Sequence, residues 1–173
     1  MKGNLKKIAI GAMTIILLIP GGCRKKSTAE VIHDRLENII KLAEKKATDP
    51  LMECLTADYQ DFELHGKSET QSLLNDHFRQ FKGIVIHPLS FRLKNVLTDR
   101  AQVELEIALS SGAAEVLRQL IPFSFENYRF MLNLRQDAGN WVISYAEWKP
   151  IPLEELYPES LAVFKKLFPE MFK

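Results

Sequence analysis

The chain has 173 residues, of which 46% are hydrophobic and 26% charged, and its formal net charge at pH 7 is +1. This composition is typical of one globular domain and excludes a disordered or fibrous chain. Basic and acidic residues are nearly balanced, which argues against the basic surface that nucleic-acid-binding proteins need, so we expect no nucleic-acid partner.

The first 22 residues have the features of an export signal. Lys2, Lys6 and Lys7 precede an apolar stretch at residues 8–19, with no acidic residue before position 23. That stretch would form a helix of only ~18 Å, whereas the hydrocarbon core of a bilayer is ~30 Å thick. We therefore predict a secretory signal peptide at residues 1–22 and not a membrane-spanning helix.

Cys23 follows Gly21 and Gly22 directly, and this arrangement resembles the bacterial lipoprotein signal, with Pro20 where that signal usually has an aliphatic residue. The resemblance implies lipidation of the Cys23 thiol, including palmitate, and cleavage before it. The mature chain would be anchored to a bacterial membrane facing the periplasm or the exterior, on the outer membrane if Gram-negative sorting applies. Residues 23–27 would be a tether, and the net charge would become −2. The alternative is an ordinary secretory signal in which Cys23 is incidental.

The remaining cysteine and the histidines do not predict a metal centre. If Cys23 carries a lipid, Cys54 has no disulfide partner and is expected to be a small buried residue. No HxxxH or HExxH spacing occurs among the four histidines, so we predict neither a metal nor another cofactor. The histidines are His33, His65, His77 and His87.

Two helices are expected first in the mature chain. Ser27 and Glu30 form a capping box, and apolar residues then recur at helical spacing up to Lys46. Asp49 followed by Pro50 predicts the N-cap and first position of a second, short helix that carries Leu51, Cys54 and Leu55.

A third helix follows an extended or irregular segment at residues 58–64. Ser68 with Gln71 predicts the capping box of this helix, and Gly83 predicts its end. His77 lies at the edge of the apolar stripe of the helix, where a hydrogen bond at the rim or in the core is the favoured interpretation.

From residue 84 onward the alternation of apolar and polar residues predicts a sheet. Strands are expected around residues 89–93, 101–109, 128–134 and 141–148, with turns at 98–100 and 137–140. Pro88 predicts an edge or a bulge. The connection at 110–122 is expected to include a helical turn around 115–120. A C-terminal extension at 151–173 contains a short helix at 160–167.

Helices followed by antiparallel strands predict an α+β fold in which the N-terminal helices pack on a curved antiparallel sheet. The chain resembles the nuclear transport factor two-like superfamily, which includes polyketide cyclase-like proteins. The resemblance rests on the residues at 51–62, Gly66, the hairpin at 89–109 and the segment 139–143. The resemblance implies a cone-shaped domain at residues 28–150 that encloses a cavity. Members use this cavity for isomerisation, dehydration, ligand binding or partner docking, so the fold does not settle the function.

Strict alternation predicts which polar side chains reach the cone. It places His87 on the face of Leu89, Phe91 and Leu93, and Tyr145 with Glu147 on the face of Trp141 and Ile143, unless Pro88 shifts the register of its strand. The residues predicted to bind a ligand are Tyr59, Phe62, His87, Phe91, Tyr128, Tyr145 and Glu147.

Two aspartates flank Tyr59 at a position where some cavity enzymes of the superfamily keep an acid. Asp58 and Asp61 lack a partner histidine in the adjacent sequence, so capping of a loop is the favoured interpretation. An enzyme would need at least two of His87, Tyr145, Glu147 and Asp61 to meet in an enclosed pocket.

We therefore expect a membrane-anchored extracytoplasmic lipoprotein that binds a small apolar ligand or a protein partner and has no catalytic residue. One alternative is a cavity enzyme of the isomerase or dehydratase type, and another is a structural docking subunit of a cell-envelope complex. The C-terminal aromatic residues are expected either to pack over the sheet or to form an exposed patch for a partner. They are Tyr157, Phe164, Phe168 and Phe172.

Overall fold

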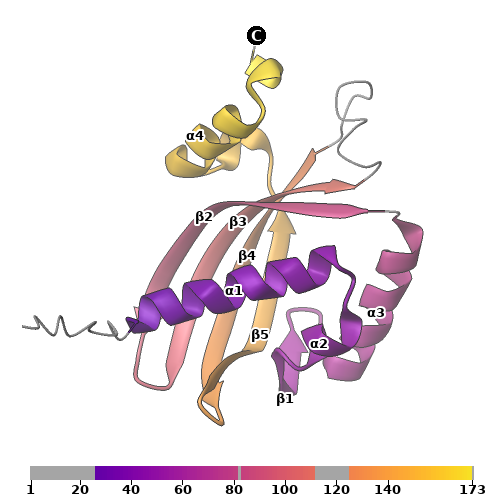
Figure 1. The fold of residues 1–173 in the computed structure, drawn as a ribbon, viewed down its shortest axis with the longest axis vertical. Helices are drawn as coiled ribbons and strands as arrows, with labels where there is room; N and C mark the ends of the chain where they lie inside the picture. The colour runs from indigo at the N-terminus through magenta and orange to yellow at the C-terminus, as the bar shows by residue number, and fades with distance from the viewer. Residues whose placement is uncertain (1–25, 82, 112–124, 173) are drawn as a thin grey trace, which may run out of the picture.

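Four helices and a five-stranded sheet form the fold of this computed structural model, which describes residues 26–81, 83–111 and 125–172 (Figure 1). The predicted signal peptide, Cys23 and the helical turn expected at 115–120 lie outside the described residues. No helix among the described residues is long and apolar enough to cross a membrane. The helices are α1 (Thr28–Glu44), α2 (Thr48–Met52), α3 (Lys67–Gln80) and α4 (Pro158–Leu167).

Helix α1 begins at the predicted capping box. The Ser27 hydroxyl accepts a hydrogen bond from the Glu30 amide at 3.2 Å, and the Glu30 carboxylate accepts one from the Ser27 amide at 2.7 Å. These two bonds satisfy amides that a helix start leaves unpaired. Ile32 and Leu36, one turn apart on the same side of the helix, are buried against the sheet.

The predicted starts of the other two N-terminal helices are wrong by two residues. The N-cap of α2 is Ala47, and Asp49 lies in the first turn, where it accepts a hydrogen bond from Gln71 Nε2 at 3.0 Å. The N-cap of α3 is Gly66 instead of Ser68, because Gly66 pairs with Gln60 as the chain turns back and then accepts the Thr70 amide. At neither start does the predicted residue act as the N-cap, and Asp49 and Gly66 instead have partners outside their own helices.

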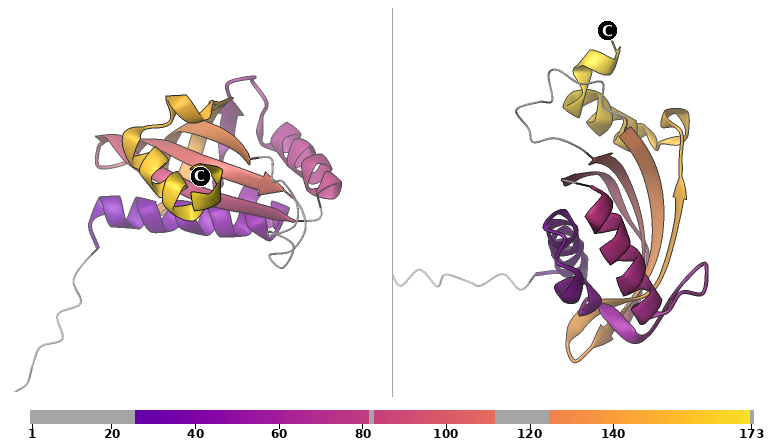
Figure 2. Two further views of the ribbon diagram at one scale, coloured as in Figure 1. Left: turned by 90° about the horizontal axis from the view of Figure 1, so that it is seen from above. Right: turned by 90° about the vertical axis from the view of Figure 1, so that its right-hand side faces the viewer.

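The sheet has the strand order β1-β5-β4-β3-β2, in which β1 runs parallel to β5 and the other neighbours are antiparallel. The N-terminal helices α1 and α3 lie on one side of the curved sheet (Figure 2). This confirms the predicted α+β fold. The strands are β1 (Leu55–Asp61), β2 (Ile84–Val96), β3 (Arg100–Ser111), β4 (Phe125–Asp137) and β5 (Asn140–Pro150).

We call the side of the sheet that packs against α1 the inner face, and the opposite side the outer face. Val103 and Leu132 are directly opposed across β3 and β4 and pack with Ile32 and Leu36 of α1. Helices α2 and α3 cover a second cluster around Phe78 and Ile84. The apolar residues that alternate along β3 and β4 therefore form the core between sheet and helices.

Register shifts in β2 and β5 change which residues reach the inner face, and in β2 there are two, between Pro88 and Ser90 and between Leu93 and Asn95. In β2 the register shifts between Pro88 and Ser90, so that His87 opposes Ala108 on the outer face while Phe91 opposes Leu105 on the inner face. The prediction that His87 shares a face with Phe91 and Leu93 is therefore wrong. The proline that we expected to mark a bulge does so, because it cannot donate to the ladder.

A further bulge lies in β5 at Ser144. Leu134 opposes Ile143, but Asn133 opposes Tyr145, so one residue of β5 is left over and the alternation reverses beyond it. Tyr145 and Glu147 are consequently on the outer face, and the prediction that they share a face with Trp141 and Ile143 is wrong. Ala146 and Trp148 take the inner positions instead.

The hairpin between β4 and β5 turns at the predicted residues. Ala138 and Gly139, at its centre, have φ values of 48° and 82°. Two consecutive positive φ angles are the geometry of a tight hairpin turn, which glycine adopts without steric cost.

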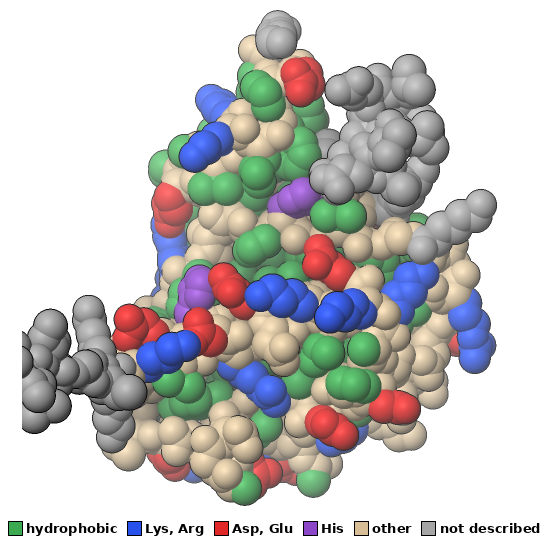
Figure 3. Space-filling view, viewed as in Figure 1, with side chains coloured by type: hydrophobic (Ala, Val, Ile, Leu, Met, Phe, Trp, Pro, Cys, Tyr) green, Lys and Arg blue, Asp and Glu red, His purple; other side chains and the backbone are tan. Residues whose placement is uncertain are grey.

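The C-terminal extension packs on the outer face near one end of β2 and β3. It contains the 3-10 helix η2 (Leu153–Glu155), α4 and the 3-10 helix η3 (Pro169–Phe172). Phe164 of α4 is fully buried against Leu89 and Ala108, and Phe168 packs beside it, as predicted for part of this segment. Hydrophobic side chains also gather on the surface of α4 and η3 (Figure 3). The exposed members are Val163, Leu167, Met171 and Phe172.

Candidate inner-face site

An aromatic row crosses the inner face of the sheet. Trp148, Phe130, Leu105 and Phe91 are directly opposed residues on β5, β4, β3 and β2, so their side chains lie side by side. The Trp148 and Phe130 ring centroids are 6.2 Å apart, and Phe62, which follows β1, meets Trp148 edge to face at 4.8 Å. We call Phe62, Trp148, Phe130, Phe91 and the neighbouring Tyr128 the aromatic row.

The row is only partly covered, in contrast to the core beside it. Val103 and Leu132, one step further along the strands, are buried under α1, whereas Phe62 is 41% exposed and the other aromatic side chains of the row are half-buried. Partly exposed rings in one line offer apolar area and ring faces and edges to a ligand.

Tyr128 contributes a polar group beside Phe130, two residues away on the same strand. Its hydroxyl donates a hydrogen bond to Glu126 Oε2 at 2.6 Å. Burial raises the pKa of Tyr128 to about 12, and the hydrogen bond and negative charge of Glu126 act in the same direction. The phenol is therefore neutral at pH 7, and its oxygen can still accept a hydrogen bond from a ligand.

A buried carboxylate lies next to Phe62, which is at one end of the row. Asp61, the last residue of β1, is 1% exposed and opposes Ala146 on the inner face. Its Oδ1 accepts the amides of Glu63 and His65 at 2.9 Å each, and its Oδ2 lies 3.0 Å from His65 Nδ1. The two amide bonds confirm the predicted loop capping by Asp61.

The contact between Asp61 and His65 also has chemical consequences. A neutral imidazole that donates from Nδ1 to a carboxylate keeps its lone pair on Nε2, where it can accept a proton or a hydrogen bond. The His65 side chain is 32% exposed, so this ring is accessible to solvent while Asp61 is not. Asp58 has a different role, since it forms a two-bond ion pair with Arg135 at 2.6 and 2.9 Å.

The structure divides the predicted ligand-binding residues between the two faces. Tyr59, Phe62, Phe91 and Tyr128 are on or beside the inner face, and Tyr59 is buried in the core, where burial raises its pKa to about 12. The other three residues, His87, Tyr145 and Glu147, are on the outer face.

The outer-face residues do not form the enclosed pocket that an enzyme would need. The His87 ring meets Phe168 at 5.1 Å, in the region covered by the C-terminal extension. Tyr145 and Glu147 contact each other at 3.5 Å near the surface. Asp61 is the only one of the four proposed catalytic groups on the inner face among the described residues. His77 packs beside Phe81 at 4.6 Å, at the rim of α3.

His65, Phe130 and Trp148 belong to the site but are absent from the residues predicted to bind a ligand. His65 follows Asp61 by four residues and precedes Gly66, a spacing that a tight loop brings together, whereas we considered only adjacent positions. Alternation alone would place Trp148 on the face opposite Tyr145 and Glu147, and the bulge at Ser144, which decides where that face lies, has no clear signal in the sequence. In the described part of the chain, no three His, Cys, Asp or Glu residues are arranged to hold a metal ion.

No protein-family model matches the sequence, and no curated protein matches it. The fold does match solved structures. A candidate scytalone dehydratase from Novosphingobium aromaticivorans aligns with a TM-score of 0.62 at 12% identity, over 72% of this chain and 84% of that one. An NTF2-like protein of unknown function from Pseudomonas putida aligns with a TM-score of 0.61 at 17% identity, over 78% and 100%.

A candidate dehydratase of the NTF2-like family from Streptomyces avermitilis has a TM-score of 0.61 at 12% identity, over 72% of this chain and 97% of that one. At these identities the similarity shows the fold alone. The described domain has the NTF2-like fold, and the expected cone architecture is confirmed.

Proposed function

We propose that the domain binds a small apolar ligand containing a ring against the aromatic row, without catalysis, and that it does so outside the cytoplasm, tethered to a membrane by a lipid on Cys23. The observation that carries the binding proposal is the row itself. Several aromatic side chains are aligned by strand register yet only partly buried, although a fully packed core lies one step away.

The ligand class follows from the groups around the row. Ring edges and faces favour a flat apolar ligand, and each aromatic contact contributes ~0.5–1.5 kcal/mol beyond area burial. The oxygen of Tyr128, on the same strand as Phe130, and the Nε2 of His65, whose ring contacts Asp61 next to Phe62, offer polar groups near the row. A ring with one or two hydroxyl or carbonyl groups would match this arrangement.

Fluorescence tests the proposal directly. Of the two tryptophans, Trp141 is buried and Trp148 belongs to the row, so titration with 2-naphthol should change the emission of Trp148. Phe130→Leu should weaken binding ~2–10-fold, which corresponds to the loss of one aromatic contact. Phe172→Leu, in the C-terminal extension, is the matched control and should bind normally. Equal affinities for both variants would contradict the assignment of the site.

Mass spectrometry of an extract should identify the natural ligand. An organic extract of the purified protein should contain a compound that is depleted in extracts of the Trp148→Ala variant. Identical extracts from both proteins would argue against the aromatic row as the binding site.

A cavity enzyme of the isomerase or dehydratase type is the second candidate, and the Asp61–His65 contact is the observation that favours it. A histidine oriented by a buried carboxylate can act as a general base beside an apolar surface. Incubation of the extracted compound with the protein in D₂O should then produce deuterium incorporation or loss of one water. His65→Gln should abolish the change, and His77→Gln should not. An unchanged compound would leave the binding proposal as the better one.

The anchor has its own test. Metabolic labelling with palmitate should mark the wild-type chain and not the Cys23→Ser variant, and unchanged labelling of the variant would contradict lipidation.

Crosslinking in cells addresses the docking alternative, because a defined envelope partner that is captured independently of the aromatic row would favour a docking role.

A further inference from the structure

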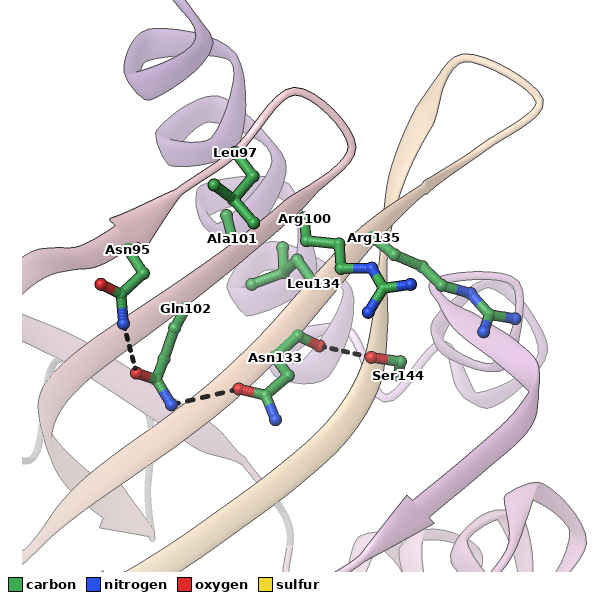
Figure 4. A pocket seen from close by; sticks show the side chains of 9 residues that line it. All are labelled: Asn95, Leu97, Arg100, Ala101, Gln102, Asn133, Leu134, Arg135 and Ser144. Atoms are coloured by element: carbon green, nitrogen blue, oxygen red, sulfur yellow. Dashed lines mark hydrogen bonds between the residues drawn. The ribbon is translucent and has the colours of Figure 1, made fainter.

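A groove of about 390 Å³ lies on the outer face of the sheet, away from the aromatic row. Asn95, Gln102, Asn133 and Ser144 line it from four successive strands, and Leu97 with Arg100 lines it at the turn between β2 and β3 (Figure 4). Gln102 and Asn133 are directly opposed, so strand register places their side chains on the same face.

Side-chain amides form a chain along this groove. Asn95 Nδ2 donates to Gln102 Oε1 at 3.3 Å, and Gln102 Nε2 donates to Asn133 Oδ1 at 3.3 Å (Figure 4). The Ser144 hydroxyl donates to the Asn133 backbone carbonyl at 3.1 Å, which fixes the bulge beside the groove. The amide groups are thus oriented by one another before any ligand arrives.

The chain leaves hydrogen-bonding groups unused. A carboxamide has two N–H donors and an oxygen that accepts two bonds. Within the described residues, the Asn133 amide nitrogen and the Asn95 oxygen have no hydrogen-bond partner, and Gln102 Nε2 has a second contact only with the Met131 sulfur, at 3.6 Å. Donors and acceptors therefore alternate across the strands and are available at the surface.

The charged groups at the groove have partners of their own. Arg135 is engaged by both oxygens of Asp58, and Arg100 has Asp99 at 3.8 Å. The oriented polar groups of the groove are therefore neutral amides and a hydroxyl. Leu97, which is 64% exposed, adds an apolar wall.

We infer that this groove binds a neutral oligosaccharide. A sugar hydroxyl both donates and accepts a hydrogen bond, as a carboxamide does, and the C–H side of a sugar ring suits an exposed leucine. A phosphate or a carboxylate would have to compete with Asp58 and Asp99 for the two arginines at the groove. This inference is independent of the ligand proposed for the inner face.

Nuclear magnetic resonance of the full chain, labelled with ¹⁵N at Asn and Gln and held in a detergent without a sugar headgroup, tests the inference. The probes are maltotriose, cellotriose, N,N′,N″-triacetylchitotriose and the charged trigalacturonate. At least one of the three neutral probes should shift the side-chain amide signals of Gln102 and Asn133 at millimolar concentration. No shift with any neutral probe, or a shift with trigalacturonate only, would overturn the inference.

Substitutions separate the groove from general surface effects. Gln102→Leu interrupts the amide chain and should weaken binding at least tenfold, as should the more exposed Asn95→Ala, which does not touch the core. Gln80→Leu, at the exposed end of α3, is the matched control and should bind normally. Sedimentation tests whether a second copy of the chain occupies the groove instead. A dimer that dissociates in Gln102→Leu and that no saccharide perturbs would overturn the inference.

Discussion

The strongest stability prediction concerns Glu106, a carboxylate with no exposed surface under the C-terminal extension. Its Oε1 accepts hydrogen bonds from Arg129 Nε at 2.8 Å and Nη2 at 2.5 Å, and its Oε2 accepts the Tyr157 amide at 3.1 Å. Arg129 Nη2 also donates to the Glu155 carbonyl at 2.7 Å. The ion pair thus connects β3 and β4 to the C-terminal extension.

Arg129→Met should remove the partner and leave the Glu106 charge buried. Breaking a buried ion pair in this way costs ~3–5 kcal/mol, because the remaining charge is desolvated and uncompensated. For a domain of this size that corresponds to a decrease in Tm of roughly 6–20 °C. The double variant Glu106→Gln with Arg129→Met removes the charge and keeps an acceptor for the Tyr157 amide, so it should lose only ~1–2 kcal/mol.

Urea unfolding followed by circular dichroism measures these free energies. The control is Arg79→Met, which breaks an exposed ion pair with Asp76 and should cost less than ~0.5 kcal/mol. The diagnostic result is that the double variant is more stable than Arg129→Met alone by ~2 kcal/mol. If the second substitution only adds to the loss, the buried charge is not the cause and the argument fails.

Three further predictions follow from groups with shifted pKa values. Burial would raise the pKa of Glu104, but hydrogen bonds from Lys94 and Tyr157 outweigh it and lower the pKa below 4.5. The free energy of unfolding should therefore decrease as the pH falls through that range, and it should depend less on pH in Glu104→Gln. Equal pH dependence of both proteins in urea unfolding would contradict this. Burial raises the pKa of the Cys54 thiol, so Ellman's reagent should react with it only after unfolding, and rapid native labelling would refute its burial. Burial raises the pKa of Tyr59 to about 12. Because Tyr59 ionises at lower pH in the unfolded chain, the free energy of unfolding should decrease above pH ~10. If absorbance shows that all tyrosines ionise near pH 10, this prediction is contradicted.

The fold was largely predictable because its main features depend on local sequence patterns. The capping box at Ser27, the alternation in β3 and the turn at Ala138 and Gly139 each depend on a few neighbouring residues. The starts of α2 and α3 were less predictable, since Asp49 and Gly66 have partners far away or across a turn that local capping rules do not include.

The candidate sites were harder to predict because a single extra residue in a strand reverses every later side chain. Pro88 indicated one bulge, but Ser144 resembles any other polar residue of an alternating strand. The hydroxyl of Ser144 donates to the Asn133 carbonyl, a contact that requires the neighbouring strand to be in place. The bulge is therefore a property of the strand pair and not of the β5 sequence alone.

This bulge also decides how the two proposed sites can be tested separately. Beyond Ser144 it places Trp148 on the inner face with Phe130, and Tyr145 on the outer face opposite Asn133. A change at Tyr145 should therefore affect the outer groove and leave the aromatic row intact, although alternation alone assigns Tyr145 to the cone. Tyr145→Ala should alter the amide signal of Asn133 while leaving naphthol binding at Trp148 unchanged. The opposite outcome would mean that β5 pairs with β4 without the bulge, so that Tyr145 would lie on the inner face and Trp148 on the outer face, whereas Phe130 and Asn133 would keep their places.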